Sequence, residues 1–271
     1  MFQSIATPKP LRFILAASFA ALMATSCSKK DLQAPETPAE VSTATSAQQI
    51  EELRQFVISS TGENSVSYTA TTKEFIIGGD GVMPLEDAKE QLKKFNTTEL
   101  EGTAAGMQHR RSFYVVAPAK AVAVKIFADA TVPAVWLTAL DKAIANWNAS
   151  GSKLVISRTT TPSLANTTVK GVNNGGNGVL ATANYPDYNS NAGKFITINT
   201  FYNSLAASKQ IFAITHELGH TYGFGHTNST YGTLVPNSPN ADPNSIMNAV
   251  CLNWSAFTAY DLQAIRTIYP K

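Results

Sequence analysis

The segment His216-Glu217-Leu218-Gly219-His220-Thr221-Tyr222-Gly223-Phe224-Gly225-His226 holds three of the four histidines of this 271-residue chain. Helical positions four apart lie on the same face, so His216 and His220 can direct two imidazole rings at one ion. Zinc takes about four ligands, with nitrogens about 2 Å away, and a catalytic zinc leaves one position for water. The spacing therefore predicts a zinc site on a helix.

Two other residues of the segment fit a catalytic zinc. Glu217 follows the first ligand directly, so its carboxylate reaches a metal-bound water, whose pKa the metal lowers, and takes its proton. Gly223 permits the left-handed conformation that ends a helix, which lets the chain return with a third ligand. We predict His216, His220 and His226 as metal ligands and Glu217 as general base. Any side chain at position 223 is expected to strain the turn.

A surface helix that merely carries histidines is the alternative interpretation of this segment. Ile211, Ile214 and Leu218 predict instead that the helix is largely buried, where unpaired histidines and a carboxylate are costly. The complete pattern also requires five correct positions at once, so we favour the metal site.

The region around the segment predicts a mixed α and β domain over residues 112–271. Pro133–Ala149 is expected to be a helix with Trp136, Leu140, Ile144 and Trp147 on one face. The helix that carries the histidines is expected over Ala206–Tyr222, and a capping box at Thr258 and Asp261 opens a closing helix. Strands are expected at Val122–Phe127, Leu154–Arg158, Val169–Val172, Gly178–Ala183 and Phe195–Asn199.

Residues 50–111 form a smaller accessory unit or pro-segment, too short for more than a marginal core of its own. A short helix is expected at Glu51–Ile58 and a longer one at Pro84–Phe95. Ser65–Ala70 and Lys73–Ile77 alternate like a pair of strands, and a turn at Gly78–Gly81 follows them.

The first 49 residues read as an export signal and a tether. Lys9 and Arg12 precede the apolar run Phe13–Met23, which is too short to span a bilayer comfortably, so a membrane anchor is disfavoured. The stretch before Cys27 resembles the lipobox of bacterial lipoproteins, which implies a signal peptide over residues 1–26, lipidation of Cys27 and a membrane anchor. Residues 27–49 have the composition of a flexible tether. We expect an outer-membrane or cell-surface lipoprotein, with ordinary secretion as the alternative and the orientation of the anchor open.

Composition narrows the function further. The chain is 44% hydrophobic and 15% charged with a net charge of +2, so it is a globular protein without the basic patch of a nucleic-acid partner. Its two cysteines provide no disulfide framework if Cys27 carries lipid.

The extended histidine segment resembles the metzincin clan of zinc peptidases, whose further mark is a methionine in a turn beneath the metal; Met247 in Ser245–Asn248 matches it. Together with Tyr260–Arg266, these stretches look like the dual-action HEIGH metallopeptidases, with Leu218 in place of their usual isoleucine. The resemblance covers about residues 113–271. It implies an α+β, metzincin-like (zincin) fold: a twisted mixed sheet, a backing helix, an active-site helix and a smaller C-terminal subdomain.

The resemblance also implies how substrate binds and where this chain departs from its relatives. Gly178–Ala183 would be the edge strand along which an extended peptide or protein substrate adds as a further strand. Ala249 stands where astacin-like relatives place a tyrosine ligand, so zinc itself is expected to stabilise the oxyanion, and Tyr231 and Tyr260 are unplaced candidates.

Latency is a separate question, because some relatives block the zinc with a pro-segment cysteine, and the only cysteine of this chain upstream of the histidines is Cys27. Asp80 and His109 are the candidates for that role. Arg110-Arg111 is either a processing site or an exposed basic pair.

These observations predict a zinc-dependent endopeptidase in which Glu217 activates a metal-bound water. The alternatives are a non-catalytic binding or adhesion lipoprotein that keeps the fold, and a zinc hydrolase of a non-peptide bond. One catalytic Zn²⁺ is expected; Ca²⁺ near Asp187 or Asp242 has no supporting spacing. Cleavage preference and oligomeric state stay open.

Overall fold

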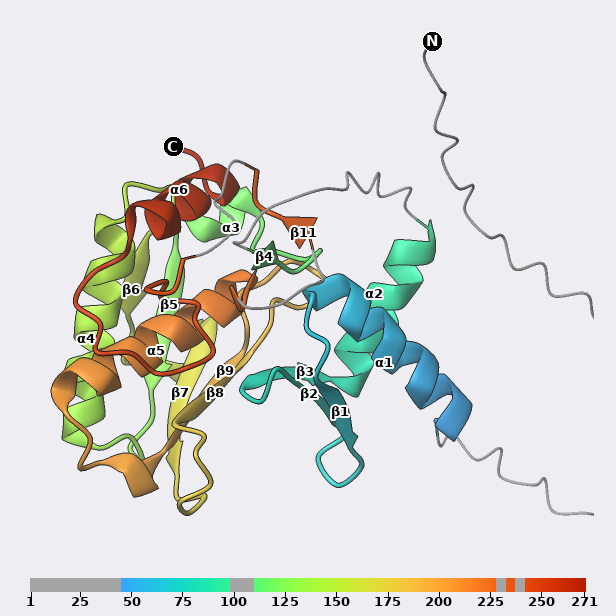
Figure 1. Ribbon diagram of the computed structural model, residues 1–271, viewed down its shortest axis with the longest axis horizontal. Helices are drawn as coiled ribbons and strands as arrows, with labels where there is room; N and C mark the ends of the chain where they lie inside the picture. Colours follow the sequence, from blue (N-terminus) through green and yellow to red (C-terminus); the bar gives the residue numbers. More distant parts are fainter. Residues whose placement is uncertain (1–44, 98–109, 228–232, 237–241) are drawn as a thin grey trace, which may run out of the picture. The chain divides into compact units, whose positions relative to one another are not determined.

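The first two histidines of the segment lie on helix α5 (Ala207–Tyr222), which packs against a mixed sheet in the computed structural model of the chain (Figure 1). The structure describes residues 45–97, 110–227, 233–236 and 242–271. Residues 45–271 form one compact unit. The predicted signal peptide and Cys27 lie outside the described residues. Of the helices in the described part, none is long and apolar enough to cross a membrane.

The main sheet has eight strands in the order β1-β2-β3-β8-β9-β7-β5-β6. β6, β5, β7 and β9 run parallel to one another, whereas β8 is antiparallel to β9. β1, β2 and β3 form an antiparallel meander. The strands span Val66–Thr69 (β1), Glu74–Ile77 (β2), Gly81–Pro84 (β3), Val124–Ala128 (β5), Ile156–Arg158 (β6), Thr167–Val172 (β7), Ala181–Asn184 (β8) and Phe195–Asn199 (β9).

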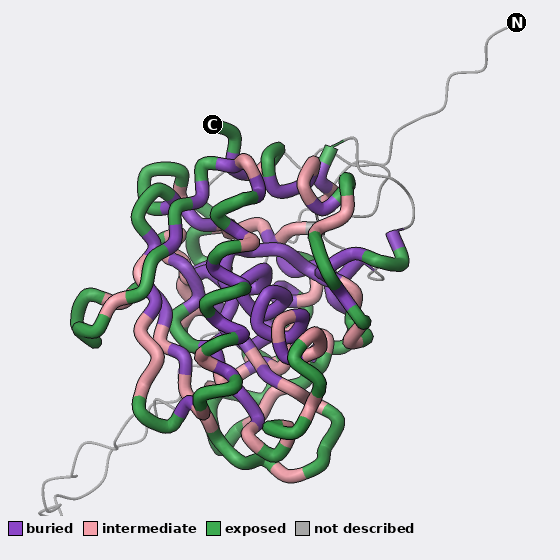
Figure 2. The backbone as a smooth tube through the Cα atoms, turned by 90° about the vertical axis from the view of Figure 1, so that its left-hand side faces the viewer, coloured by how far each residue is buried: buried purple, intermediate pink, exposed green. Residues whose placement is uncertain are grey.

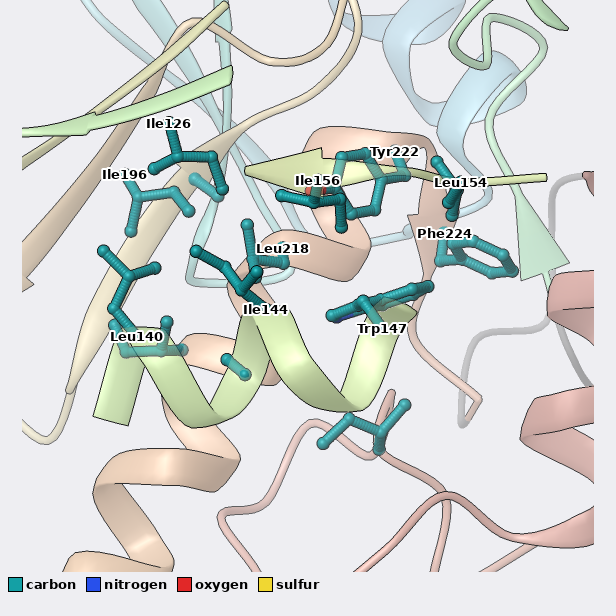
Figure 3. Packing of buried hydrophobic residues seen from close by; sticks show 14 of the residues in the cluster. Ile126, Leu140, Ile144, Trp147, Leu154, Ile156, Ile196, Leu218, Tyr222 and Phe224 are labelled. Atoms are coloured by element: carbon teal, nitrogen blue, oxygen red, sulfur yellow. The ribbon is translucent and has the colours of Figure 1, made fainter. Parts of the chain in front are cut away.

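Helix α4 (Ala134–Ala149) lies behind α5 and forms the main core with it and the sheet (Figure 3). The four residues predicted to share one face, Trp136, Leu140, Ile144 and Trp147, are all buried. Trp147 donates a hydrogen bond from Nε1 to the carbonyl of Thr215 at 3.0 Å, which joins the two helices directly. The predicted mixed sheet, backing helix and active-site helix are therefore confirmed.

The N-terminal residues form a second, smaller core over β1–β3. Helices α1 (Ala47–Thr61) and α2 (Leu85–Thr97) cover these strands, with Phe56, Val57, Phe75 and Met83 buried between them. Tyr185, which follows β8, is buried in the same cluster, so this core continues into the larger part of the unit. Figure 2 shows the buried residues gathered in the middle of the fold and the exposed ones at its periphery.

Strand β8 was predicted to be an edge strand, and that prediction is wrong. β3 pairs with it in parallel, with Gly81 opposite Ala183 and Val82 opposite Asn184. The amides of Ala183 and Tyr185 donate to the carbonyls of Asp80 and Val82, each at 3.0 Å. The N-terminal strands therefore use the hydrogen-bonding groups of β8 that an added substrate strand would need.

Sequence patterns located most of the N-terminal elements and missed one. The helix expected at Glu51–Ile58 is longer, because a capping box at Ser46 and Gln49 starts it earlier. The strand pair and the Gly78–Gly81 turn are confirmed. β3 was not predicted, and Pro84 ends that strand instead of opening a helix. Gly81 and Pro84 are poor strand formers, so the sequence of β3 did not indicate a strand.

The remaining elements of the described part are a small second sheet, three short helices and a closing helix. Arg110–Arg111 (β4) is the central strand of a small sheet with β10 (Phe224–Gly225) and β11 (Thr233–Leu234), so its backbone is paired and not free. Short helices occur at Pro118–Ala121 (α3), Pro162–Leu164 (η1) and Thr200–Tyr202 (η2). The closing helix α6 (Ala259–Ile268) begins with the predicted capping box of Thr258 and Asp261.

Candidate metal centre

Helix α5 ends at the residue that the sequence predicted, and the chain then turns back toward the helix. Gly223 is the C-cap, with φ +98° and its amide bonded to the carbonyl of His220 at 3.0 Å. A β-carbon there would lie 2.9 Å from the carbonyl oxygen of Tyr114, so a side chain is excluded by space as well as by backbone conformation. The turn brings His226 opposite the helix.

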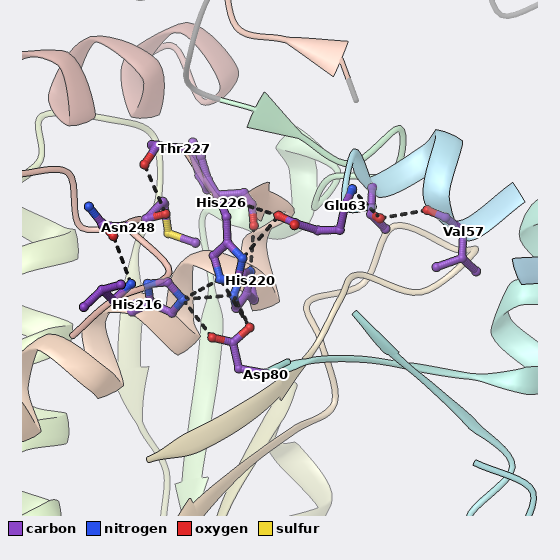
Figure 4. A network of polar contacts seen from close by, with 12 residues as sticks. Val57, Glu63, Asp80, His216, His220, His226, Thr227 and Asn248 are labelled. Atoms are coloured by element: carbon purple, nitrogen blue, oxygen red, sulfur yellow. Dashed lines mark hydrogen bonds and ion pairs between the residues drawn. The ribbon is translucent and has the colours of Figure 1, made fainter. Parts of the chain in front are cut away.

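The three histidines converge through their Nε2 atoms (Figure 4). Nε2 of His216 lies 3.0 Å from Nε2 of His220 and 3.2 Å from Nε2 of His226. All three side chains are buried. Two of the rings are oriented by backbone carbonyls on their far side. Nδ1 of His216 donates to Ile246 at 2.7 Å, and Nδ1 of His220 donates to Phe224 at 2.8 Å. Such bonds leave Nε2 unprotonated and free to bind a metal.

Asp80, from the turn between β2 and β3, completes the group. One carboxylate oxygen lies 3.4 Å from Nε2 of His216, and the other lies 3.4 Å from that of His220 and 3.2 Å from that of His226. Four ligands about 2.0–2.1 Å from a tetrahedral zinc stand about 3.3–3.4 Å from one another. The four side chains therefore have the composition and spacing of a zinc site. Asp80 was one of two candidates for a blocking residue; the other, His109, lies outside the described residues.

Gly78 allows the Asp80 turn to approach so closely. Its φ is +63°, and a β-carbon on it would lie 2.8 Å from Nδ1 of His226. Only glycine meets both requirements without displacing the histidine ring. Gly78 thus does more than reverse the chain, because it brings the backbone against the third histidine.

The turn Ser245–Asn248 packs against α5, and Met247 is buried in it against Gly219. A β-carbon on Gly219 would fall inside the contact distance of the Met247 sulfur, which explains why the helix carries glycine there. Asp261 of α6 holds this turn: it accepts from Oγ of Ser245 at 2.7 Å and from the amide of Ile246 at 3.1 Å. The carbonyl of Ile246 in turn orients His216.

Glu217 faces a cleft beside the histidines. Its side chain is buried, and among the described residues none hydrogen-bonds to its Oε2. The cleft measures about 170 Å³ and is also lined by Phe212, Val179 and Leu180. A small-molecule site usually exceeds about 300 Å³. Gly78, Gly79 and Asp80 also line it, so the Asp80 turn occupies part of the space beside Glu217.

Burial and the clustered charges shift the pKa values of these groups. Burial raises the pKa of Asp80, but hydrogen bonds from the three histidines outweigh it and hold that pKa well below its usual range. Burial, and then the negative charge of Asp80, raise the pKa of Glu217 well above its usual value. Burial lowers the pKa of His226, but Asp80 and Glu63 more than compensate and raise it to about 10. Asp80 is thus an anion within the histidine cluster.

The structure leaves several sequence candidates away from the centre. Tyr260 is 44% exposed on α6 and does not line the cleft, whereas Ala249 does. Tyr231 lies outside the described residues. The carboxylate of Asp187 accepts from the amides of Asn189 and Asn191, and neither it nor Asp242 joins a metal-binding group in the described part.

Two residues near the centre escaped the sequence analysis. Glu63 contacts His226, and Cys251 is a free, half-buried thiol in the lining of the cleft. Neither position has a local signal: Glu63 is one of many glutamates, and the spacing between Cys251 and the histidines fits no ligand pattern.

The structure resembles solved protein structures at low sequence identity. A structure of myroilysin is 17% identical, covers 56% of this chain and 94% of its own, and superposes with a TM-score of 0.42. High choriolytic enzyme 1, a hatching-enzyme zinc-protease from the medaka fish Oryzias latipes, is 14% identical, covers 58% of this chain and 94% of its own, and has a TM-score of 0.40. Among curated proteins, none matches the chain.

A family model, by contrast, matches the chain over residues 75–233, which is more than half of it. The match begins well before residue 113, where the sequence resemblance was expected to start. It includes the Asp80 turn together with the three histidines, and it ends before Met247. The chain belongs to the dual-action HEIGH metallo-peptidase family.

Proposed function

We propose that this chain is a zinc-dependent endopeptidase of the metzincin type whose metal is held by His216, His220 and His226. The observation that carries the proposal is the convergence of three buried Nε2 atoms beside the buried carboxylate of Glu217. Nε2 of His216 lies 3.0 and 3.2 Å from the other two, and Oε2 of Glu217 has no hydrogen-bond partner among the described residues. Family membership supplies the reaction class, which is hydrolysis of peptide bonds in peptides or proteins.

Each residue has a separate part in the proposed reaction. When bound, zinc lowers the pKa of a water and polarises the scissile carbonyl. Glu217 adjoins the first ligand and lies in the cleft, so its carboxylate is placed to take the proton of that water and to pass it to the leaving amine. His216 and His220 are fixed by backbone carbonyls, which keeps their Nε2 atoms directed at the metal position.

The described chain represents a latent form of this enzyme. Asp80 stands where a fourth ligand would be, at 3.2–3.4 Å from the three Nε2 atoms. That is the position which a catalytic zinc site keeps for water. β3 also pairs with β8, so residues 45–97 contact both the metal position and the strand next to it. We assign this N-terminal unit (residues 45–97) as an inhibitory pro-segment.

Substrate would take the place of β3. An extended peptide gains affinity by pairing with an exposed strand, and specificity by placing alternate side chains in pockets. Once β3 leaves, the outward amides of Ala183 and Tyr185 become available for that pairing. The part of the cleft lined by Phe212 and Leu180 adjoins Glu217 and would hold a substrate side chain beside the scissile bond.

Metal removal tests the peptidase assignment. The purified chain, after limited proteolysis to release the N-terminal unit, is expected to cleave casein, to lose that activity with 1,10-phenanthroline and to regain it with added zinc. The measurement is the release of acid-soluble peptides over time. Cleavage that persists unchanged in the chelator would contradict a zinc peptidase, and the absence of any cleavage would favour a binding protein or a hydrolase of another bond.

The membrane location is a proposal of its own. We infer from the sequence before Cys27 that its thiol carries lipid and anchors the enzyme outside the cytoplasm. Bacteria that express the chain should incorporate labelled palmitate into it, and the Cys27→Ser variant should lose the label. Equal labelling of both proteins would refute the anchor without affecting the peptidase assignment.

A further inference from the structure

The three histidines differ in what holds the far side of each ring. His216 and His220 each donate from Nδ1 to a backbone carbonyl, and both carbonyls come from the part of the chain that follows residue 111. His226 is held by a side chain of the N-terminal unit instead. Its Nδ1 lies 3.2 Å from Oε1 of Glu63, and its own backbone amide donates to that same oxygen at 3.0 Å. One carboxylate oxygen therefore fixes both the backbone and the ring of the third ligand (Figure 4).

Glu63 is itself held firmly. Its residue is 7% exposed, and it follows Gly62, which ends α1 in the left-handed conformation with φ +84°. A hydrogen bond joins the end of α1 to the part of the chain that follows residue 111. The amide of Phe113 donates to the carbonyl of Ser60 at 2.8 Å. Glu63 thus enters the site from a fixed helix end and not from a loose loop.

Gly78 packs against the same edge of the His226 ring. A β-carbon on Gly78 would lie 2.8 Å from Nδ1 of His226 and 3.3 Å from the carboxylate carbon of Glu63. His226, Glu63 and Gly78 are therefore in mutual contact, and two of the three come from the N-terminal unit. The ring of His226 has no comparable carbonyl partner from its own side among the described residues.

We propose that Glu63 is the positioning residue for the third metal ligand, so that the N-terminal unit helps to build the metal centre as well as to block it. The proposal rests on the ligand set of the proposed function. A buried carboxylate that accepts from the non-ligating nitrogen of a histidine fixes its ring and raises the basicity of the other nitrogen. The chain is therefore expected to hold its metal more tightly with Glu63 in place than without it.

The test is metal affinity, measured on the full chain by competition with a chromophoric zinc chelator. Removal of a carboxylate that orients a metal-bound histidine typically weakens binding by about 10–100-fold. Glu63→Gln keeps the shape of the side chain and loses its charge, so it should fall in that range, and Glu63→Ala should lose at least as much. Glu86→Gln is the matched control, since it makes the same change at an exposed position of the same unit and should leave affinity unchanged.

A double-mutant cycle separates positioning from general stability. If Glu63 acts through His226, Glu63→Ala should weaken binding no further in a His226→Ala background, but should keep its full effect in a His216→Ala background. Additive losses in both backgrounds, or zinc affinity of Glu63→Gln equal to that of the unmodified chain, would overturn the proposal. Cobalt substitution gives a second readout: the visible bands of Glu63→Gln should keep four-coordinate intensity. Neither measurement involves substrate, so a failed peptidase assignment would leave the result intact.

Discussion

Replacing Asp80 by alanine is expected to raise the cleavage rate of a short quenched-fluorescent peptide by the full-length chain at least about tenfold, a difference of about 1.4 kcal/mol. The anionic carboxylate lies 3.2–3.4 Å from all three Nε2 atoms, at the position that water or a substrate carbonyl must take. Alanine supplies no ligand atom. The three histidines and Glu217 remain in place, so the change removes the obstruction and leaves the proposed machinery intact.

The size of the substrate should decide how much activity appears. Even without the carboxylate, β3 stays paired with β8, because those hydrogen bonds use the backbone carbonyls of Asp80 and Val82. A peptide of a few residues needs little of β8, whereas a protein substrate needs the paired strand. Asp80→Ala should therefore accelerate cleavage of the short peptide more than cleavage of casein. Limited proteolysis of the N-terminal unit should then abolish that difference.

Asp141→Ala is the matched control for this experiment, because Asp141 of α4 forms an exposed ion pair with Arg158 of β6. It should leave the activity of the full-length chain as it is. Zinc content must be measured for each protein. An Asp80→Ala chain that retains zinc and stays as inactive as the parent would show that Asp80 is not the inhibitory ligand. A chain that loses its zinc would show that Asp80 mainly retains the metal.

The convergence of the three histidines was largely predictable from sequence, because the features that produce it are local. His216 and His220 are one helical turn apart, and the glycine that follows them determines where the helix ends. The same holds for the capping box at Thr258 and for the buried face of α4, which depends on helical periodicity alone. Each of these features is set by residues within a few positions of one another.

The sequence offered Asp80 only as one of two candidates for a blocking residue, because its approach to the histidines depends on contacts between distant residues. Asp80 lies far from His216 in sequence, and only the pairing of β3 with β8 brings the two together. β3 has a weak strand signal, so nothing in the chain indicated that the expected edge strand already had a neighbour. Glu63 was missed for the same reason: its role follows from where α1 ends, not from its neighbours in sequence.

The largest loss is expected for Glu217→Gln. A positioned general base contributes about 10²–10⁴-fold to a rate, so kcat should fall by roughly that factor in a chain activated by Asp80→Ala. Glutamine has nearly the same shape but accepts no proton. Oε2 of Glu217 has no hydrogen-bond partner among the described residues, so the substitution breaks no contact of that atom. Zinc content and thermal stability are therefore expected to stay close to those of the parent.

Two comparisons make this prediction specific to proton transfer. Glu217→Asp keeps the carboxylate but draws it back by one methylene, so it should retain more activity than the glutamine variant while its KM changes little. Glu90→Gln, the same change on the exposed side of α2, should have no effect. If Glu217→Gln kept more than a tenth of the activity with its zinc bound, another group would have to act as the base, and the buried carboxylate beside His216 would serve only the structure of the cleft.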